Sequence, residues 1–382
     1  MIIENAKRVR TGSPAEFAWS VLRKFQNVDL VAKRIVELHQ VPRKYHDAAR
    51  KQAQQIRYCL IQAREYFTAA SDVSTATKPN LLYYGTMSLA LAEILFKQSG
   101  DSSLDRAREE NRHHGLTMTV GSVKKGADLQ EAAQAIRARP HEVLGKRHGT
   151  FELWHKTSRE HPLAGDTTSY IETGGSNIGF RTIFKAIDAR YPPVPDTGLS
   201  LADCLSSIPL MFEHLDGTTL SSTLVRGRCI STIWPGPEWR AQHQVVFHPS
   251  PLYAQLLDSL RVDPNAIDRI EIHEAGLAAT VLLHTDWVNG GIYLPFPPAA
   301  TVNTAEWRMW TNSPPLTEYG YLYVAVYLAG NYARYFPDKW LVDVEASTLL
   351  SLAIEELCAL CEWRVPWLAL CELDQVLYVP EA

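Results

Sequence analysis

Apolar residues recur at helical spacing in two stretches of the N-terminal third of the chain. In residues 44–70 the apolar positions alternate between steps of four and three: Ala49, Ala53, Ile56, Leu60, Ala63 and Phe67. Positions at this spacing share one side of a helix. Residues 80–98 would form a helix that is apolar almost all the way round. The pattern begins after Thr77-Lys78-Pro79 and ends at Ser99-Gly100. We therefore predict two long helices, of which the second is the buried centre of a bundle.

Capping boxes mark the starts of two more helices. In residues 13–16 (Ser-Pro-Ala-Glu) and residues 200–203 (Ser-Leu-Ala-Asp), the serine hydroxyl can accept the backbone N–H three residues later, and the acidic side chain can reach back. The first box predicts a helix that begins at this point. The second predicts a helix over residues 199–215, and Pro209 should kink it.

Shorter elements are predicted between and after these helices. Residues 149–155 alternate between apolar and polar residues as a half-buried strand does, residues 178–183 read as a further strand, and residues 244–248 and 279–283 are short strand-like pieces. Residues 127–139 have the pattern of a short amphipathic helix. Helical spacing returns over residues 319–335 and again over 339–363, and we expect this last helix to end before Pro366.

Together these patterns predict a mainly α fold of the α+β class in three regions. Residues 1–140 form an N-terminal helical bundle, residues 141–315 an inserted mixed α/β segment, and residues 316–382 a C-terminal helical segment that packs back on the bundle. The return packing is expected because a helix that is apolar all round, like the one at 80–98, needs covering on more sides than the N-terminal helices supply.

The formal net charge of −4 is unevenly distributed. Residues 1–64 hold 13 Lys or Arg against 5 Asp or Glu, whereas residues 338–382 hold 2 against 9. A basic end can serve nucleic acid or an acidic partner. The alternative, which we favour, is that the two ends lie against each other or form solvated helix faces, because no stripe of alternating basic and aromatic residues occurs.

Composition excludes several classes of protein. No stretch reaches the roughly 18–20 uninterrupted apolar residues of a membrane helix, and residues 1–10 carry no apolar secretory signal. We therefore expect a soluble, cytoplasmic protein. Its six cysteines do not suggest a disulfide framework. Cys358 and Cys361 have the spacing of a zinc knuckle, but a second ligand pair is missing, so we interpret them as core residues.

Candidate sites for metals and cofactors are few. His141, His148 and His155 recur every seven residues, but in a strand this step reverses the face, so their side chains should not converge on a metal. Residues 174–177 (Gly-Gly-Ser-Asn) could wrap an anion with backbone N–H groups or form a turn. No nucleotide-binding or nucleophile motif occurs. We predict no metal and no small-molecule cofactor.

Several segments of the chain resemble YaaC-like bacterial proteins. They are residues 78–95 (KPNLLYYGTMSLALAEIL), 114–116 (HGL), 201–209 (LADCLSSIP) and 332–340 (YARYFPDKW). These motifs shape packing rather than chemistry, and the family has no settled function to carry over. The resemblance therefore implies a fold family for most of the chain and no particular activity.

Residues 44–120 also resemble the HEPN helical bundle of bacterial toxins and defence proteins: a long helix, a helix led by two tyrosines, and a polar loop that ends in His-Gly. Members that cut RNA use an Arg followed a few residues later by a His. The resemblance implies catalytic roles for Arg108, His113 and His114, and binding roles for Arg106, Arg112, Tyr83 and Tyr84. One departure is that a small polar residue usually follows the Arg, where this chain has Glu109.

Such a set of residues could cleave RNA without a metal. A neutral histidine can take the proton of a ribose 2′-OH, while an arginine stabilises the charge that builds on the phosphate oxygens. Against this hypothesis, Glu109 and Glu110 would repel the phosphate that Arg108 must hold. A loop of alternating Arg and Glu is also typical of a solvated surface.

The sequence supports two functions and leaves open whether the protein is an enzyme. The first is a non-catalytic or regulatory subunit, in phage defence or a stress response, that binds a protein partner or a second copy of itself. It rests on the lack of a complete catalytic motif and on large aromatic residues, which are most often core but also dominate interfaces: Trp287, Trp307, Trp310, Trp340, Trp363 and Trp367. The alternative is a metal-independent ribonuclease that uses Arg108 and His113, with RNA as the partner. Neither function requires a membrane.

Overall fold

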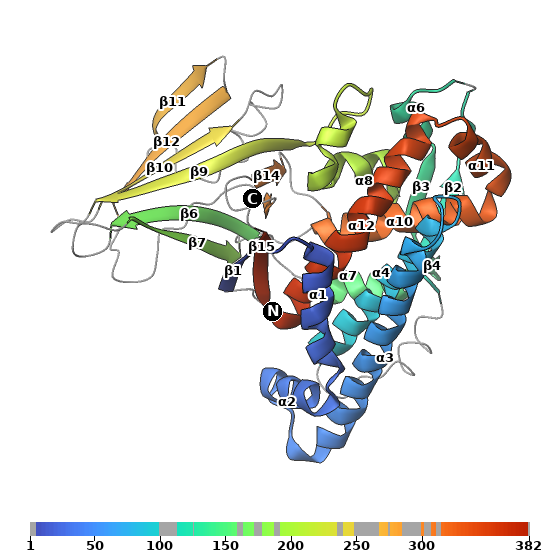
Figure 1. Ribbon diagram of the computed structural model, residues 1–382, viewed down its shortest axis with the longest axis horizontal. Helices are drawn as coiled ribbons and strands as arrows, with labels where there is room; N and C mark the ends of the chain where they lie inside the picture. Colours follow the sequence, from blue (N-terminus) through green and yellow to red (C-terminus); the bar gives the residue numbers. More distant parts are fainter. Residues whose placement is uncertain are drawn as a thin grey trace.

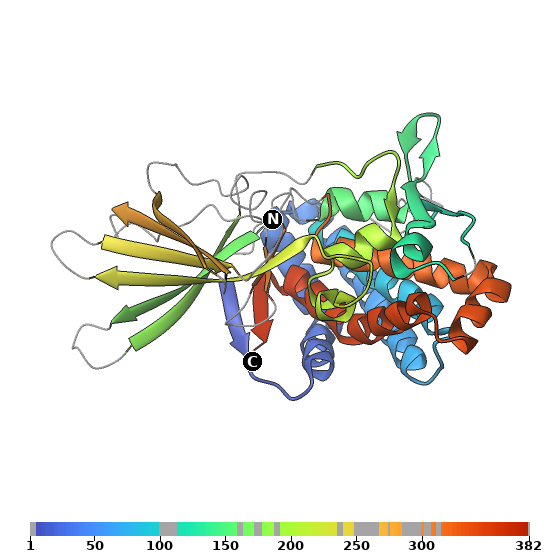
Figure 2. The same ribbon diagram turned by 90° about the horizontal axis from the view of Figure 1, so that it is seen from above.

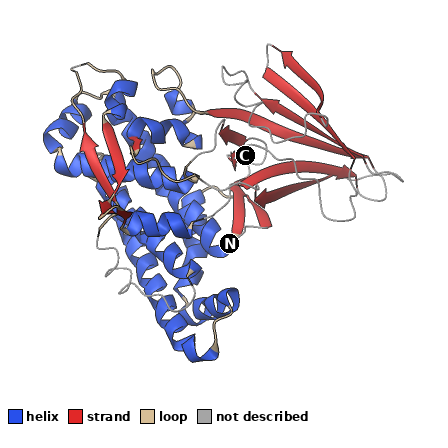
Figure 3. Cartoon of the chain, turned by 180° about the vertical axis from the view of Figure 1, so that it is seen from behind, coloured by secondary structure: helices blue, strands red, loops and turns tan. Residues whose placement is uncertain are grey.

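The computed structural model describes residues 5–98, 113–124, 126–158, 163–171, 178–186, 192–234, 240–247, 267–273, 276–284, 299–301, 307–310 and 315–380. Packed helices form one block, and long strands extend from one side of it (Figures 1 and 3). Helices account for more of the described residues than strands do. The prediction of a mainly α fold that also contains strands is therefore confirmed.

Helix α4 (Lys78–Lys97) lies at the centre of the helical block. Helices α3 (His46–Ser71), α10 (Glu318–Tyr335) and α12 (Leu349–Asp374) pack against it, and so does the short helix α7 (Thr150–Thr157) (Figure 1). Because α4 is apolar almost all round, packing on several sides removes its surface from water. Both long N-terminal helices predicted from the apolar pattern are confirmed, and the apolar stripe of α3 is buried throughout.

Both capping boxes begin a helix as predicted. Helix α1 (Pro14–Leu22) starts after Ser13, whose hydroxyl accepts the backbone N–H three residues later. Helix α8 (Leu201–Ser207) starts after Ser200, where the hydroxyl and the returning carboxylate both make their hydrogen bonds. From Pro209 the chain continues as two short 3-10 turns. The predicted kink is therefore a full break of the helix.

The predicted strand at residues 149–155 is wrong, because this segment belongs to helix α7. Phe151 and Trp154 explain the difference. They lie three residues apart and are both only 1 % exposed. This step puts two side chains on opposite faces of a strand but on one side of a helix. Local alternation fits either structure over so short a segment, and burial against the neighbouring helices selects the helix.

The segment at residues 127–139 is only half helical, which corrects a second prediction. Helix α6 (Leu129–Gln134) takes the first half, and strand β3 (Ile136–Pro140) takes the second. Strand β3 pairs with β2 (Leu116–Val120) and β8 (Leu199–Ser200) in a three-stranded antiparallel sheet. Pairing with a strand that lies far along the chain leaves no signal in the local pattern.

The last predicted helix, at residues 339–363, is in fact two helices. Helix α11 (Pro337–Glu345) comes first, and α12 runs through Pro366 as far as Asp374. A proline inside a helix costs about 3 kcal/mol, because it removes a hydrogen bond and crowds the preceding turn. Five side chains after the proline are at most 1 % exposed: Trp367, Ala369, Leu370, Cys371 and Leu373. Their burial offsets the loss and keeps the helix intact.

The long strands form an eight-stranded sheet that extends away from the helices (Figures 1 and 2). Its main path is β11-β12-β10-β9-β14-β13, and β6 pairs with β7 and β9. The bounds are β6 (Leu163–Ile171), β7 (Ile178–Ala186), β9 (Leu224–Trp234), β10 (Arg240–Phe247), β11 (Ile267–His273), β12 (Gly276–His284), β13 (Ala299–Thr301) and β14 (Trp307–Trp310), with a separate hairpin of β4 (Glu142–Val143) and β5 (Lys146–Arg147). Three predicted strands are thus confirmed as β7, β10 and β12.

The two ends of the chain meet. Strand β1 (Asn5–Val9) pairs in parallel with β15 (Val376–Pro380) (Figure 2). Arg34, on helix α2 (Val28–His39), pairs with Asp374 at 2.9 Å. These contacts confirm the expectation that the basic and acidic ends lie against each other.

Helices from the first and the last predicted regions share one block, since α10 and α12 contact α4. Where the domain boundaries fall, at residues 140 and 315 or elsewhere, stays a prediction. In the part of the chain that the structure describes, no helix combines the length and the apolar character needed to cross a membrane.

Candidate functional site

Helix α4 places Tyr83 and Tyr84 beside His114. Tyr83 is 2 % exposed, and its hydroxyl lies 2.8 Å from Nδ1 of His114. The rings of Tyr323 and Tyr327, from α10, pack edge-on against Tyr83 with centroid distances of 6.1 and 5.3 Å. Tyr83 is therefore fixed by the core, and its hydroxyl holds the imidazole in one position.

The start of α7 fixes the backbone around this imidazole. The N–H groups of Thr150 and Phe151 donate to the carbonyls of His113 and His114, each at 3.0 Å. Gly149 makes the close approach possible, because its φ is +114° and a Cβ there would lie 2.3 Å from the backbone of the residue after His114. Only glycine accepts both the dihedral angle and the short distance.

Arg334 places a positive charge near His114. Arg334, in the last turn of α10, donates from Nη1 to the hydroxyl of Tyr84 at 2.6 Å. Burial, followed by the charges of Arg334 and His113, lowers the pKa of His114 from its usual 6.5. The imidazole is therefore neutral at pH 7, so it can accept a proton as well as donate one. We call Tyr83, Tyr84, His114 and Arg334 the His114 site.

Two hydrogen-bond arrangements are open to the His114 site. Oη of Tyr83 lies 2.8 Å from Nδ1 of His114 and 3.8 Å from Sδ of Met87. If the hydroxyl proton points to Nδ1, the imidazole carries its own proton on Nε2 and is a donor there. If it points to Sδ, Nδ1–H donates to Tyr83, and Nε2 presents a lone pair that can act as a base. The position of this one proton decides the chemistry of the site.

His113 lies outside the His114 site. It is exposed, and its ring centroid is 4.5 Å from that of His141, whose Nδ1 lies 3.2 Å from Oγ1 of Thr117. His155 instead lies against the carbonyl of Pro315, with Nε2 at 3.3 Å. The evenly spaced histidines thus serve separate contacts. Among the described residues, no group of three potential ligands could hold a metal ion.

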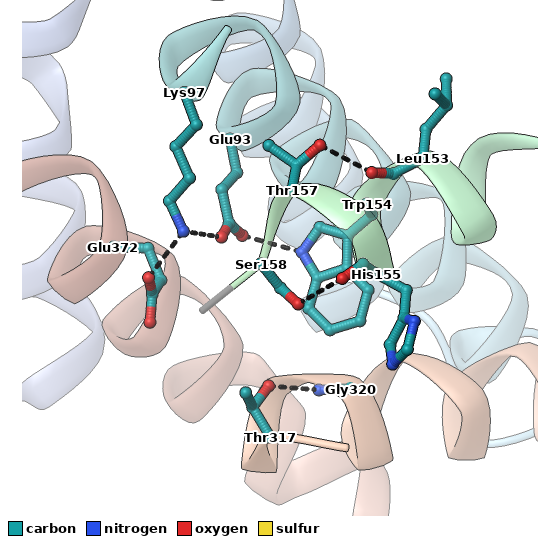
Figure 4. A network of polar contacts seen from close by, with 10 residues as sticks. All are labelled: Glu93, Lys97, Leu153, Trp154, His155, Thr157, Ser158, Thr317, Gly320 and Glu372. Atoms are coloured by element: carbon teal, nitrogen blue, oxygen red, sulfur yellow. Dashed lines mark hydrogen bonds and ion pairs between the residues drawn. The ribbon is translucent and has the colours of Figure 1, made fainter. Parts of the chain in front are cut away.

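A second polar group on α4 is sealed in the core (Figure 4). Nζ of Lys97 lies 2.5 Å from Oε1 of Glu93 and 2.8 Å from Oε2 of Glu372, and Nε1 of Trp154 donates to Oε2 of Glu93 at 2.8 Å. The side chains of Lys97, Glu93 and Glu372 are 3, 1 and 8 % exposed. We call these four residues the buried Glu93 cluster. It ties the end of α4 to α12 and α7.

Two carboxylates share one ammonium in the buried Glu93 cluster. Burial raises the pKa of Glu93 above its usual 4.5, and the charge of Lys97 opposes this only in part. Burial alone would lower the pKa of Lys97, but Glu372 and Glu93 together outweigh burial and raise it. Lys97 therefore stays charged, and Glu93 is a weaker acid than usual. Because these groups have almost no contact with solvent, their role is to join helices.

The structure brings together only some of the predicted site residues. Three meet at the His114 site: Tyr83, Tyr84 and His114. The three predicted arginines lie outside the described residues: Arg106, Arg108 and Arg112. Sequence reasoning missed Arg334, which has no local signal because the packing of α10 on α4 brings it to His114. It also missed Glu93 and Lys97, although opposite charges four residues apart in an apolar helix are a readable signal.

Most of the described tryptophans of the second half are core residues. Trp310, Trp340 and Trp367 are at most 3 % exposed, which leaves little of them for a partner. Trp287 and residues 174–177 lie outside the described residues. Cys358 and Cys361 are 1 and 0 % exposed, as expected for core packing.

An exposed apolar surface lies on α11 and at the start of α12. Four of its side chains, Leu341, Val342, Leu349 and Leu352, are 44, 61, 50 and 44 % exposed. Three exposed acidic residues lie among or just after them in the sequence: Glu345, Glu355 and Glu356. We call these seven residues the α11–α12 surface. Exposed apolar side chains rimmed by polar ones are characteristic of sites that another molecule covers.

Comparison with known proteins shows a family but no function. No curated protein and no solved structure matches the chain. The model of one protein family, described as YaaC-like Protein, matches residues 23–373, which is most of the chain. The matched range includes every motif on which the resemblance to this family rested. The chain therefore belongs to the YaaC-like family.

Proposed function

We propose that the protein is a non-catalytic, regulatory subunit that binds another protein through the α11–α12 surface. The observation that carries this proposal is the exposure of four large aliphatic side chains close to acidic residues. Apolar groups rimmed by polar ones are typical of protein–protein interfaces. A partner with basic and apolar side chains would bury the aliphatic groups and pair with Glu345, while Glu355 and Glu356 already contact Thr75 and His214 within the chain. Service in phage defence or stress is an implication of the HEPN resemblance alone.

The test compares variants of the full-length protein purified gently, at low salt, from its native host. Val342→Asp combined with Leu352→Asp places charge on the α11–α12 surface. Leu30→Asp is the matched control, since Leu30 is 41 % exposed and lies on α2, at the other end of the helical block (Figure 1). Quantitative mass spectrometry should find one protein that the wild type and the control retain and the double variant loses.

The purified partner should then bind the isolated wild-type chain directly, and bind the double variant at least about tenfold more weakly. A wild-type chain that comes away alone would overturn the proposal. So would a partner that all three chains retain equally.

One observation favours a second function, metal-independent RNA cleavage. His114 is held by Tyr83, is neutral, and lies close to Arg334. When the hydroxyl of Tyr83 points to Met87, Nε2 of His114 can take the proton of a ribose 2′-OH. The 2′ oxygen then bonds to phosphorus, the bond between phosphorus and the 5′ oxygen breaks, and water supplies a proton to the leaving oxygen. Arg334 stabilises the charge on the phosphate.

This mechanism gives Arg334 and His114 the roles that the HEPN resemblance implied for Arg108 and His113. We expect the purified protein to cleave RNA in EDTA, and His114→Ala to slow cleavage by about 10²–10⁴-fold. His113→Ala should slow it less, because His113 lies outside the site. RNA that stays intact with the wild-type protein, or equal rates for wild type and His114→Ala, would exclude this function.

A further inference from the structure

We infer that Arg334, His114 and the paired rings of Tyr66 and Tyr84 form a binding site for a nucleotide, with its phosphate at Arg334 and His114 and its base against the two tyrosines. The inference deepens the second function proposed above and rests on the same site. Nucleotide binding can nevertheless be tested separately from RNA cleavage, because a site can bind phosphate without reacting with it.

Three helices and one connecting segment bring these side chains together. Tyr66 comes from α3, Tyr84 from α4 and Arg334 from the last turn of α10. The ring centroid of Tyr84 lies 6.3 Å from that of His114, and its hydroxyl accepts from Arg334 at 2.6 Å. Tyr84 therefore touches both groups, and a phosphate at the hydroxyl end of its ring is within reach of both.

Within the part of the chain that the structure describes, no acidic group balances the charge of Arg334 at this position. The guanidinium of Arg334 bonds to a neutral hydroxyl and lies 5.1 Å from the ring centroid of Tyr335. Among the described residues, Arg334 and His113 are the charged groups that act on His114, and each disfavours its imidazolium form. A cation placed beside histidines keeps donors available for an anion from outside the chain.

Other arginines that join helices of the block are balanced by acids. Arg34 has Asp374 at 2.9 Å, and Arg364 has Glu318 at 2.7 Å. Within the described residues, no carboxylate forms an ion pair with Arg334, and its side-chain hydrogen bond and its ring contact are both with tyrosines. Arg334 is thus oriented without being neutralised, which is the state expected of an arginine that binds phosphate.

The neighbouring aromatic pair indicates that the ligand is more than a bare phosphate. The rings of Tyr66 and Tyr84 are stacked, with centroids 5.7 Å apart and planes 26° apart, and both are half-buried. Sites for single-stranded nucleic acid combine such rings, on which a base stacks, with cations that hold the backbone. The arrangement therefore fits a nucleotide, either free or within an RNA strand.

The experiment follows the imidazole of His114 by NMR in the full-length protein. Three ligands are added in turn: inorganic phosphate, uridine monophosphate, and an RNA tetramer with 2′-O-methyl groups. The tetramer has no free 2′-OH to attack its phosphates, so binding is measured apart from cleavage. We expect the pKa of His114 to rise on binding, because an anion nearby favours the charged form. If the tetramer binds more tightly than the monophosphate, the ligand of the site is an RNA strand. If the two bind equally, the ligand is a free nucleotide.

The neighbours of His114 that carry or can carry charge are Tyr83 and Tyr84 on α4, Arg334 on α10 and the adjacent His113. His113 is a second histidine in the spectrum, so the titration is repeated in His113→Gln. A rise in the pKa of His114 that persists in this variant belongs to His114 itself. If the rise disappears in this variant, His114 does not contact the phosphate and the inference fails.

Variants test the roles of the individual side chains. Arg334→Gln should weaken binding of all three ligands by about tenfold or more, and Arg334→Lys less. Tyr66→Ala should weaken binding of the monophosphate and the tetramer but not of phosphate. Arg64→Gln is the matched control, since its guanidinium also lies 5.1 Å from an aromatic centroid, that of Trp19.

Two further results would overturn the site. One is a pKa of His114 that none of the three ligands changes. The other is an equal loss of binding in Arg334→Gln and Arg64→Gln. If the tetramer binds as expected while unmodified RNA stays intact, the site stands and only the ribonuclease is excluded.

Discussion

Two polar groups on the same helix, α4, have opposite surroundings. Near its C-terminal end, the buried Glu93 cluster joins one ammonium to two carboxylates, and all three side chains are less than a tenth exposed (Figure 4). Near its N-terminal end, Tyr83 and Tyr84 hold the His114 site, where an exposed arginine stands beside a neutral histidine. One group is paired inside the fold and closed to water, and the other is only partly paired and open.

The difference distinguishes a structural use of charge from a functional one. Burying an ion costs several kcal/mol unless it is paired, so a sealed cluster is stable only while every member is present. At a partly exposed site, water screens the charges. Hydrogen-bond donors of the charged side chains that have no partner in the fold remain available to a ligand. Changes in the buried cluster should therefore alter stability, whereas changes in the open site should alter binding.

Removing the cation of the buried cluster should have the largest effect. Lys97→Met removes the ammonium that pairs with Glu93 and Glu372 in the core, so we expect a loss of about 3–5 kcal/mol in the free energy of unfolding. Urea denaturation measures it. Lys33→Met, at a side chain that is 73 % exposed, is the control and should change stability by no more than about 0.5 kcal/mol. A loss for Lys97→Met no greater than for Lys33→Met would show that the cluster is not needed for folding.

Substitution in the backbone next to the His114 site should have the second largest effect on stability. Gly149→Ala forces a left-handed residue against the backbone that follows His114, so we expect a loss of about 1–3 kcal/mol and a displaced His114 resonance. Gly145→Ala is the control, because Gly145 also has positive φ, +73°, but no atom lies within 4 Å of the added Cβ. Equal losses would mean that only the dihedral angle matters, and the close approach to His114 would have no role.

The raised pKa of Glu93 should make the stability of the protein depend on pH. Because burial raises the pKa of Glu93, the folded chain binds this proton more tightly than the unfolded chain. The stability that it contributes is complete below the ordinary value of 4.5 and is lost as pH rises through the raised value. Glu93→Gln cannot ionise, so its stability relative to wild type should improve with pH across this window, by at most about 1.4 kcal/mol per pH unit.

Urea denaturation at several pH values from about 4 to about 8 measures this difference. Glu37→Gln, at a side chain that is 63 % exposed, should give a curve parallel to that of the wild type. If the curve of Glu93→Gln is parallel as well, the ionisation of Glu93 does not affect stability in this pH range.

The smallest effect is expected at the His114 site in the absence of ligand. The pKa of His114 should lie below 6.5, since burial and the charges of Arg334 and His113 disfavour the imidazolium. Arg334→Gln removes one of these charges and should raise that pKa, whereas Arg64→Gln should not. NMR titration of the imidazole measures this pKa in the three chains. A pKa that is the same in wild type and Arg334→Gln would show that Arg334 lies too far from His114 to affect its protonation.

Interactions within a few residues made much of the helical part predictable. The caps at Ser13 and Ser200 and the apolar stripe of α3 depend only on near neighbours in the chain, and all are present. The errors fall where distant segments decide the outcome. Helix α7 is set by burial against α4 and α10, β3 by pairing with β8, and the passage of α12 through Pro366 by the burial of the residues that follow.

At the candidate site, the sequence by itself determined which side chains can carry chemistry near α4: Tyr83, Tyr84 and His114. Only the tertiary structure decided that Arg334 is their cation and that Glu93 and Lys97 meet a second carboxylate, Glu372, instead of water. The physical reason is that a sequence specifies the chemistry of each side chain and its contacts within a helical turn or so. The charge and the solvent around a group, which fix its pKa and its role, come from segments that are brought close only when the chain folds.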